Sequence, residues 1–313
     1  MLLQGATVVW VLLWVWHFPR ISSRWTRRDC TLMIAGALLP LCDLLVNFMV
    51  ADDRIEALSR EPLFSAPLIG TAFIASLVML TAFVAPMSAA IRFGLSLLAG
   101  YALFMLILFF TPVGVPIAFP FSEMHWSLPV FPIGHPPLLI FLLTATAVMA
   151  IWKGSRRWFR PFSLVMVGVY LLLGFGQYGV IAHQVGHLGT PGQKVHIYPD
   201  SPWMWRWRVV VESTEEYQLR RHHVLRDDFA EPRFIPRWND QALFLKLLAD
   251  PVVNEFYYRV FRHPVVQLDT SGSQITLLLQ ELEHQWPLVP GPTFYLESDL
   301  NGRNRLYQLQ RFY

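Results

Sequence analysis

The stretch Phe64–Thr111, FSAPLIGTAFIASLVMLTAFVAPMSAAIRFGLSLLAGYALFMLILFFT, decides the fold of this chain. It contains two apolar runs separated near Pro86, and its only formally charged residue is Arg92. About 20 mostly apolar residues suffice for a helix to cross the hydrocarbon core of a bilayer. The stretch therefore predicts two adjacent transmembrane helices, Phe64–Ala85 and Phe93–Thr111.

Four further apolar segments lie in the N-terminal half. The chain of 313 residues is 54% hydrophobic and only 15% charged, whereas a water-soluble protein usually carries about a quarter charged residues. The first segment lacks the basic start and the small-residue cleavage site of a signal peptide, which favours a span there. With the two helices above, the prediction is six spans; the other four are Leu2–Phe18, Thr31–Val50, Leu138–Trp152 and Phe162–His183.

The composition changes near residue 186, and this change predicts a domain boundary. From His187 onward, acidic and basic residues are as frequent as in soluble domains. We therefore expect a membrane protein in two parts. Residues 1–186 form an all-α bundle of about six transmembrane helices, and residues 187–313 form an α+β extramembrane domain.

Basic residues in the short loops predict the orientation, because loops rich in Lys and Arg stay on the cytoplasmic side. One face has only Arg54 and Arg60. With six spans, the chain is expected in a bacterial inner membrane with its C-terminal domain in the periplasm; loss of one short span would move that domain to the cytoplasm. Arg92, at the start of its span, is expected to extend to the cytoplasmic surface. The other basic residues of the short loops lie with Arg92 on this cytoplasmic face, which carries Arg20, Arg24, Arg27, Arg28, Arg92, Lys153, Arg156, Arg157 and Arg160.

Strand patterns begin at residue 203. In Trp203–Glu212 the alternation predicts three Trp on one sheet face, with Arg206 and Arg208 on the other. The Trp face is either buried in the domain or docked on lipid headgroups. Two short helices and two hairpins are expected after this strand: the helices Asp240–Leu248 and Val253–Phe261, and hairpins that pair Val265–Leu268 with Ile275–Leu279 and Phe294–Leu300 with Arg303–Phe312.

Few residues stand out as candidates for chemistry, and no standard catalytic motif of soluble enzymes is present. The proline-rich stretch 112–137 cannot form a regular helix, so we expect a loop that either folds over the outer mouth of the bundle or lies at the interface. It holds Glu123, His125 and His135, the weak catalytic candidates. No basic run is interleaved with aromatic residues, so no nucleic-acid partner is expected.

Asp43 is the candidate metal ligand, since a carboxylate within an apolar span is costly and suggests a function. The alternative is a polar partner inside the bundle, such as Asn47 one turn later. His183 and His187 have the spacing of two metal ligands on one helix face, but no acid lies nearby to complete a site.

Several loose motifs follow one another along nearly the full chain. They are Gly36-Ala-Leu-Leu-Pro40 with Asp43, Arg60 with Ser65, Gly100-Tyr101, Phe110-Thr111-x-x-Gly114-Val115, Pro120-Phe121-Ser122, Trp126, Pro199-x-x-Pro202, Trp207–Glu212 and Phe261-Arg-His-Pro264. Their order resembles that of the bacterial inner-membrane metal-dependent hydrolases (YdjM-like, LexA-regulated).

The resemblance implies a set of His and Asp metal ligands on the first spans, and this chain lacks most of them. The family's Thr-His falls at Gln4-Gly5, its Pro-Asp-x-Asp keeps only Asp43, and its later His and Asp positions hold Phe64, Phe104 and Leu108. Because a catalytic metal needs about three protein ligands, Asp43 cannot hold one alone. We expect the three apolar residues to face one another as a plug.

Three functions follow as hypotheses. The favoured one is a catalytically degenerate family member that acts as a membrane scaffold and binds a protein partner through its C-terminal domain, without a cofactor. The alternative is an active hydrolase of a lipid-like substrate, with a divalent metal on relocated ligands. The third is a transporter component, for which the spans offer few polar residues.

Overall fold

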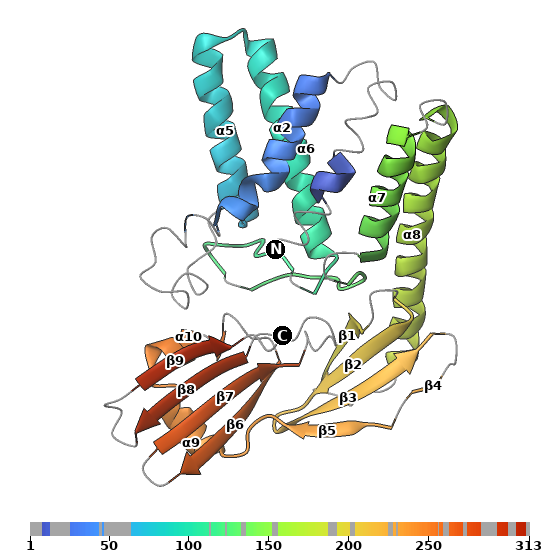
Figure 1. Cartoon of the computed structure of the whole chain (residues 1–313). Coiled ribbons are helices and arrows are strands. Elements are labelled where there is room, and N and C mark those ends of the chain that lie inside the picture. Colours follow the sequence, from blue (N-terminus) through green and yellow to red (C-terminus); the bar gives the residue numbers. More distant parts are fainter. Residues whose placement is uncertain are drawn as a thin grey trace. The chain divides into compact units, whose positions relative to one another are not determined.

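A computed structural model describes most of the chain (Figure 1). The described residues are 8–12, 26–43, 46, 64–112, 114–122, 124–132, 136–151, 156–186, 193–200, 204–224, 228–229, 231–255, 257–258, 263–271, 274–282, 293–299 and 305–310. The chain divides into two compact units, a helical unit made of Met1–Met49, Glu61–Tyr178 and Pro202–Met204, and a C-terminal unit made of Val50–Arg60, Gly179–Ser201 and Trp205–Tyr313.

The helical unit contains helices long and apolar enough to cross a membrane. Within the described residues there are three of them: α5 (Pro67–Val84), α6 (Met87–Phe109), and Pro161–Val185 of α8 (Arg156–Val185). The apolar helix α7 (Pro136–Ile151) is shorter than a full span. Within the described part of the chain, three of the six predicted spans therefore have the length needed to cross a membrane. Most of the first segment lies outside the described residues; its described part, residues 8–12, is helical.

The second predicted span, Thr31–Val50, starts earlier in the structure and contains a 3₁₀ turn. Helix α2 (Arg27–Leu38) begins earlier, because Thr26 and Asp29 form a capping box at its start. It ends at Leu38, where the short 3₁₀ helix η1 (Leu39–Leu41) follows. Pro40 accounts for this change, since proline lacks the N–H that an α-helix interior needs. Residues 44–45 and 47–50 lie outside the described part.

Helices α2 and α6 pack closely through glycines. A Cβ atom at Gly36 would collide with the backbone of Leu97, and one at Gly100 would collide with the backbone of Met33. Small residues allow this backbone contact between membrane helices, where packing replaces the hydrophobic effect as the main attraction. The buried cluster of this unit includes Ala37, Ile74, Leu97, Tyr101, Phe104, Met105 and Leu108.

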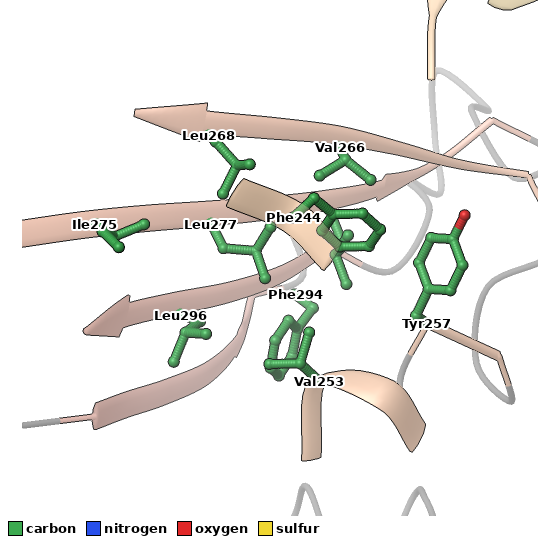
Figure 2. Packing of buried hydrophobic residues seen from close by; sticks show 10 residues of the cluster. Phe244, Val253, Tyr257, Val266, Leu268, Ile275, Leu277, Phe294 and Leu296 are labelled. Carbon is green, nitrogen blue, oxygen red and sulfur yellow. The ribbon is translucent and has the colours of Figure 1, made fainter. Parts of the chain in front are cut away.

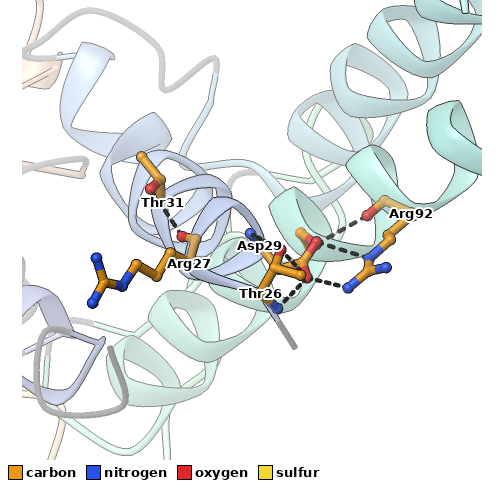
Figure 3. A network of polar contacts seen from close by, with 6 residues as sticks. Thr26, Arg27, Asp29, Thr31 and Arg92 are labelled. Carbon is orange, nitrogen blue, oxygen red and sulfur yellow. Dashed lines mark hydrogen bonds and ion pairs between the residues drawn. The ribbon is translucent and has the colours of Figure 1, made fainter. Parts of the chain in front are cut away.

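An ion pair also joins α2 to α6 (Figure 3). Arg92 Nε lies 3.0 Å from Asp29 Oδ1, and Arg92 Nη2 lies 2.5 Å from Asp29 Oδ2. Asp29 is buried, whereas the Arg92 side chain is 52% exposed. The sequence predicted only the surface position of Arg92; its bond to Asp29 links two helices that are 63 residues apart in sequence.

The C-terminal unit has two antiparallel sheets. The first contains β1 (Lys194–Pro199), β2 (Arg206–Glu212), β3 (Glu216–His223), β4 (Asp228–Phe229) and β5 (Arg233–Pro236), with β4 and β5 both paired to β3. The second is a meander of β6 (Pro264–Ser271), β7 (Gln274–Glu281), β8 (Thr293–Asp299) and β9 (Arg305–Gln310). The pairings β6–β7 and β8–β9 confirm the two predicted hairpins.

Two short helices, α9 (Gln241–Leu247) and α10 (Pro251–Glu255), pack with the second sheet. Asp240 caps α9, since its side chain accepts a hydrogen bond from the Leu243 N–H. Figure 2 shows Phe244 and Val253 from these helices beside Leu277 and Phe294 of the sheet. All four side chains are at most 2% exposed, so this cluster is the main core of the unit.

The predicted alternation in Trp203–Glu212 is wrong. Trp207 and Arg208 are both buried, at 0% and 1% exposure, while Trp205 is 46% exposed. Met204 has a φ of 57°, so the extended strand begins only after it. The strand β2 is buried on both faces, and a charged side chain there needs partners: Arg208 forms an ion pair with Asp200 and donates to the Leu282 carbonyl at 2.6 Å.

Candidate functional site

Asp43, the predicted metal ligand, is surrounded by hydrogen-bond donors of its own unit. Its Oδ1 accepts from the Phe64 N–H at 2.7 Å, and its Oδ2 accepts from the Ser65 N–H and the Ser65 hydroxyl, both at 2.6 Å. The residue is only 5% exposed. The expected partner Asn47 lies outside the described residues. The carboxylate thus holds the loop before α5, as a buried acid with its hydrogen bonds satisfied would.

Tyr101 holds the same loop from α6. Its buried hydroxyl lies 3.0 Å from the carbonyl oxygens of both Phe64 and Ala66 and can donate its one proton to either of them. A Cβ at Gly70 would collide with the Tyr101 ring, so the glycine makes room for this contact. The polar groups near Asp43 therefore connect η1, the loop and α6 into one packed structure.

The predicted apolar plug is seen in part. Phe104 and Leu108 are 0% and 2% exposed and belong to the same buried cluster. Phe64 instead packs edge-on against Phe73, with ring centroids 5.1 Å apart. Two of the three positions where the resemblance places ligands thus hold apolar core residues.

The proline-rich loop is attached to the end of α6. Val115 and Trp126 exchange two backbone hydrogen bonds of 2.9 Å, and the Phe131 N–H donates to the Phe110 carbonyl at 2.9 Å. His125 lies on this loop and is exposed. Glu123 and His135 lie outside the described residues, so the predicted meeting of these three side chains stays a prediction. The same holds for the His183–His187 pair, since His187 is not described.

A second group of polar side chains, which the sequence did not predict, gathers in the C-terminal unit. It contains His196 on β1, Glu212 at the end of β2, and His263 just before β6. His196 pairs with Val210 across the β1–β2 ladder, and Glu212 follows Val210 by two residues. Since side chains two residues apart share a sheet face, His196 and Glu212 point to the same side.

The three side chains are close enough to share one ion. Their ligand atoms all lie within 4.8 Å of one another, and His196 Nε2 lies 3.3 Å from Glu212 Oε2. The two imidazole rings have centroids 4.4 Å apart. His263 is 3% exposed, whereas the side chains of His196 and Glu212 are 32% and 21% exposed, so the group is closed on the His263 side and open on the other.

Neighbouring groups fix this cluster. The Tyr198 hydroxyl is hydrogen-bonded to His263 Nε2 at 2.6 Å, and Arg237 Nη1 donates to Glu212 Oε1 at 3.2 Å. Arg237 also stacks over the Tyr217 ring. The hydrogen bond from His196 lowers the pKa of Glu212, and the charges of His263 and Arg237 act in the same direction against its burial. Glu212 is thus ionised at neutral pH.

Sequence reasoning missed this group for identifiable reasons. The strand β1 was not predicted, so His196 was not placed beside Glu212. His263 was noted only within a four-residue motif, Phe261-Arg-His-Pro264. The hydrogen bond between Tyr198 on β1 and His263 joins residues 65 positions apart. No local sequence pattern predicts a contact over this separation.

The C-terminal unit also has a cleft of about 570 Å³ between β5 and the β6–β7 ladder. Its lining includes Phe234, which is 56% exposed, and Asn239, whose side-chain amide bonds both the N–H and the carbonyl of Leu268 at 2.8 and 2.6 Å. Among the described strands, β5 pairs with β3 alone. The remaining lining residues are Arg233, Ile235, Pro236, Val265, Val266, Gln267, Leu268, Asp269, Thr276 and Leu278.

Taken together, the fold has a helical unit with segments long enough to cross a membrane and a C-terminal unit of two sheets. Comparisons with known proteins found no matching family model, no matching curated protein and no matching solved structure. The resemblance to the YdjM-like hydrolases therefore remains a prediction from sequence motifs.

Proposed function

We propose that this chain is a multi-pass protein of the bacterial inner membrane that acts as a scaffold, with the helical unit as its anchor and the C-terminal unit as its partner-binding part. The proposal includes a bundle of about six spans, a periplasmic C-terminal unit, and descent from the YdjM-like hydrolases with loss of catalysis. The apolar segments, the basic loops and the ordered motifs support it.

The observation that carries the proposal is the environment of Asp43. Both carboxylate oxygens accept hydrogen bonds from Phe64 and Ser65. A metal ion would have to compete with these three hydrogen bonds for the carboxylate lone pairs, and each buried N–H group that lost its acceptor would cost about 1–3 kcal/mol. Phe104 and Leu108 offer no lone pairs in place of the family's ligands. The helical unit is thus better suited to anchoring than to hydrolysis.

The cleft beside β5 supports a role in binding a protein partner. The β5 strand exposes Phe234 at the cleft, and its outer edge is unpaired within the described strands. An extended segment of a partner can add to such an edge through main-chain hydrogen bonds, with an apolar side chain in the adjacent cleft.

Metal analysis of the purified full-length chain tests the loss of catalysis. We expect that an Asp43→Asn substitution leaves the metal content unchanged when it is compared in a His196→Gln background, which removes the other group of candidate ligands. A stoichiometric metal that persists in His196→Gln and disappears in the double variant would support the hydrolase instead.

Site-specific photo-crosslinking tests the partner-binding role. A photoreactive residue at Phe234 in native membranes is expected to give a discrete protein adduct. The control is Leu245 on α9, which is similarly exposed, at 58%, but does not line the cleft. Adducts that are absent from position 234, or the same at both positions, would contradict the role of the cleft.

A further inference from the structure

The group of His196, Glu212 and His263 has the chemistry of a metal site. We propose that these three residues bind one divalent transition metal of the zinc class, and that the fourth coordination position is left to solvent or to a bound group. This inference goes beyond the proposed function, which assigns no metal to the C-terminal unit.

The donor types select the class of ion. Two imidazole nitrogens and one carboxylate oxygen form the ligand set that catalytic zinc sites commonly use. Calcium and magnesium prefer sites made of oxygen ligands alone, so two histidines disfavour them. Imidazole ligands suit zinc, copper, iron and nickel. Zinc has no redox chemistry, so it can occupy such a site in a reducing or an oxidising compartment.

The distances fit a site that closes slightly around its ion. With metal bonds of about 2.0–2.1 Å, the ligand atoms of a tetrahedral site lie about 3.4 Å apart. The separation of 3.3 Å between His196 Nε2 and Glu212 Oε2 already has this value. The widest separation in the group, within 4.8 Å, needs a contraction of at most about 1.4 Å, which side-chain rotation at the two partly exposed residues can supply.

Hydrogen bonds from neighbouring side chains hold two of the three proposed ligands in place. Metal-binding histidines and carboxylates usually make a further hydrogen bond that fixes their direction. Here Tyr198 bonds His263 at Nε2, and Arg237 bonds Glu212 at Oε1, which leaves Oε2 toward His196. The buried His263 and the partly exposed His196 and Glu212 also give the ion a way in from one side.

Arg237 argues for the alternative, in which the same side chains form a polar network that needs no ion. Its positive charge next to Glu212 opposes a second cation and would weaken binding. The same geometry, however, brings two imidazole rings with centroids 4.4 Å apart beside one carboxylate. Their ligand atoms lie near one point, as those of a metal site do.

The experiment uses the full-length chain, purified in detergent without a polyhistidine tag and stripped with a chelator. After zinc is added and excess is removed by gel filtration, elemental analysis should find about one zinc per chain, since a formed site binds far more tightly than surface groups. Cobalt should give the visible absorption bands of a tetrahedral site. His196→Gln and Glu212→Gln should each lose the stoichiometric metal and these bands.

The control is His223→Gln, because His223 lies on β3 of the same sheet but outside the group; it should bind metal as the wild type does. Gel filtration and circular dichroism report whether each variant is folded. If His263→Gln does not fold, His196→Gln decides, since its side chain is 32% exposed. A wild type that binds no zinc, or His196 and Glu212 variants that keep it, would overturn the site without touching the Asp43 test of the proposed function.

Discussion

Two regions of this molecule place carboxylates beside polar partners, and they differ in what those partners are. In the helical unit, Asp43 accepts hydrogen bonds from the backbone and hydroxyl of the loop before α5. In the C-terminal unit, Glu212 faces the two imidazoles of His196 and His263. Hydrogen-bond donors occupy most lone pairs of Asp43, whereas the imidazoles bring further lone pairs to Glu212. The acid of the helical unit therefore has a structural role, and the acid of the C-terminal unit is the better candidate ligand.

The largest expected effect tests the structural half of this comparison. Asp43→Ala leaves the Phe64 and Ser65 N–H groups buried without an acceptor, and we expect a loss of about 4 kcal/mol in the free energy of unfolding. Equilibrium unfolding in mixed micelles measures it. Asp43→Asn keeps one acceptor oxygen and should lose less. A fully stable Asp43→Ala chain would show that the loop does not depend on this carboxylate.

The fold was predictable where local patterns decide it. The apolar stretch over α5 and α6 and the two C-terminal hairpins are visible in the sequence, because period and turn residues specify them. The predicted solvent-facing position of Arg208 is wrong, since alternation cannot reveal that β2 is buried on both faces or that Asp200 forms an ion pair with its guanidinium. The sequence shows Asp43 as a carboxylate within an apolar segment, but its partners, 21 and 22 residues away, depend on the tertiary fold.

The second prediction tests whether the buried ion pair of the C-terminal unit is structural, as Asp43 is. Asp200→Ala removes the carboxylate next to Arg208, whose side chain is 2% exposed. We expect a loss of about 3 kcal/mol because the buried guanidinium then loses the carboxylate that balances its charge. Pulse proteolysis of the full chain can follow it.

Asp269→Ala is the matched control for this prediction. Asp269 lies on the edge strand β6 and is exposed, so its loss should change stability by no more than about 0.5 kcal/mol. Equal losses of stability for Asp200→Ala and Asp269→Ala would mean that the Asp200–Arg208 ion pair does not stabilise the fold.

A smaller effect is expected from the contact between α2 and α6. Gly100→Ala places a Cβ against the Met33 backbone, and we expect a loss of about 2 kcal/mol because the helices must separate. Gly168→Ala on α8 is the control, since nothing lies within 4 Å of the added atom; it should be neutral or slightly stabilising. Unfolding in mixed micelles compares the two, and a harmless Gly100→Ala would contradict the close packing.

The smallest expected loss of stability comes from a substitution at Tyr198. It distinguishes a structural role from a role in metal binding, because stability and zinc affinity can be measured separately for the same variant. Tyr198→Phe removes the hydroxyl bonded to His263 Nε2 and keeps the ring in its core cluster, so stability should fall by only about 1 kcal/mol. If Tyr198 orients His263 as a metal ligand, zinc affinity should fall by about tenfold or more, which is the usual effect of losing a hydrogen bond to a metal-binding histidine. Competition with a chromophoric chelator measures the affinity, and thermal unfolding of the metal-free chain measures the stability. A purely structural hydroxyl would lower the stability and leave the zinc affinity unchanged, and Tyr198 would then not be a residue that orients a metal ligand.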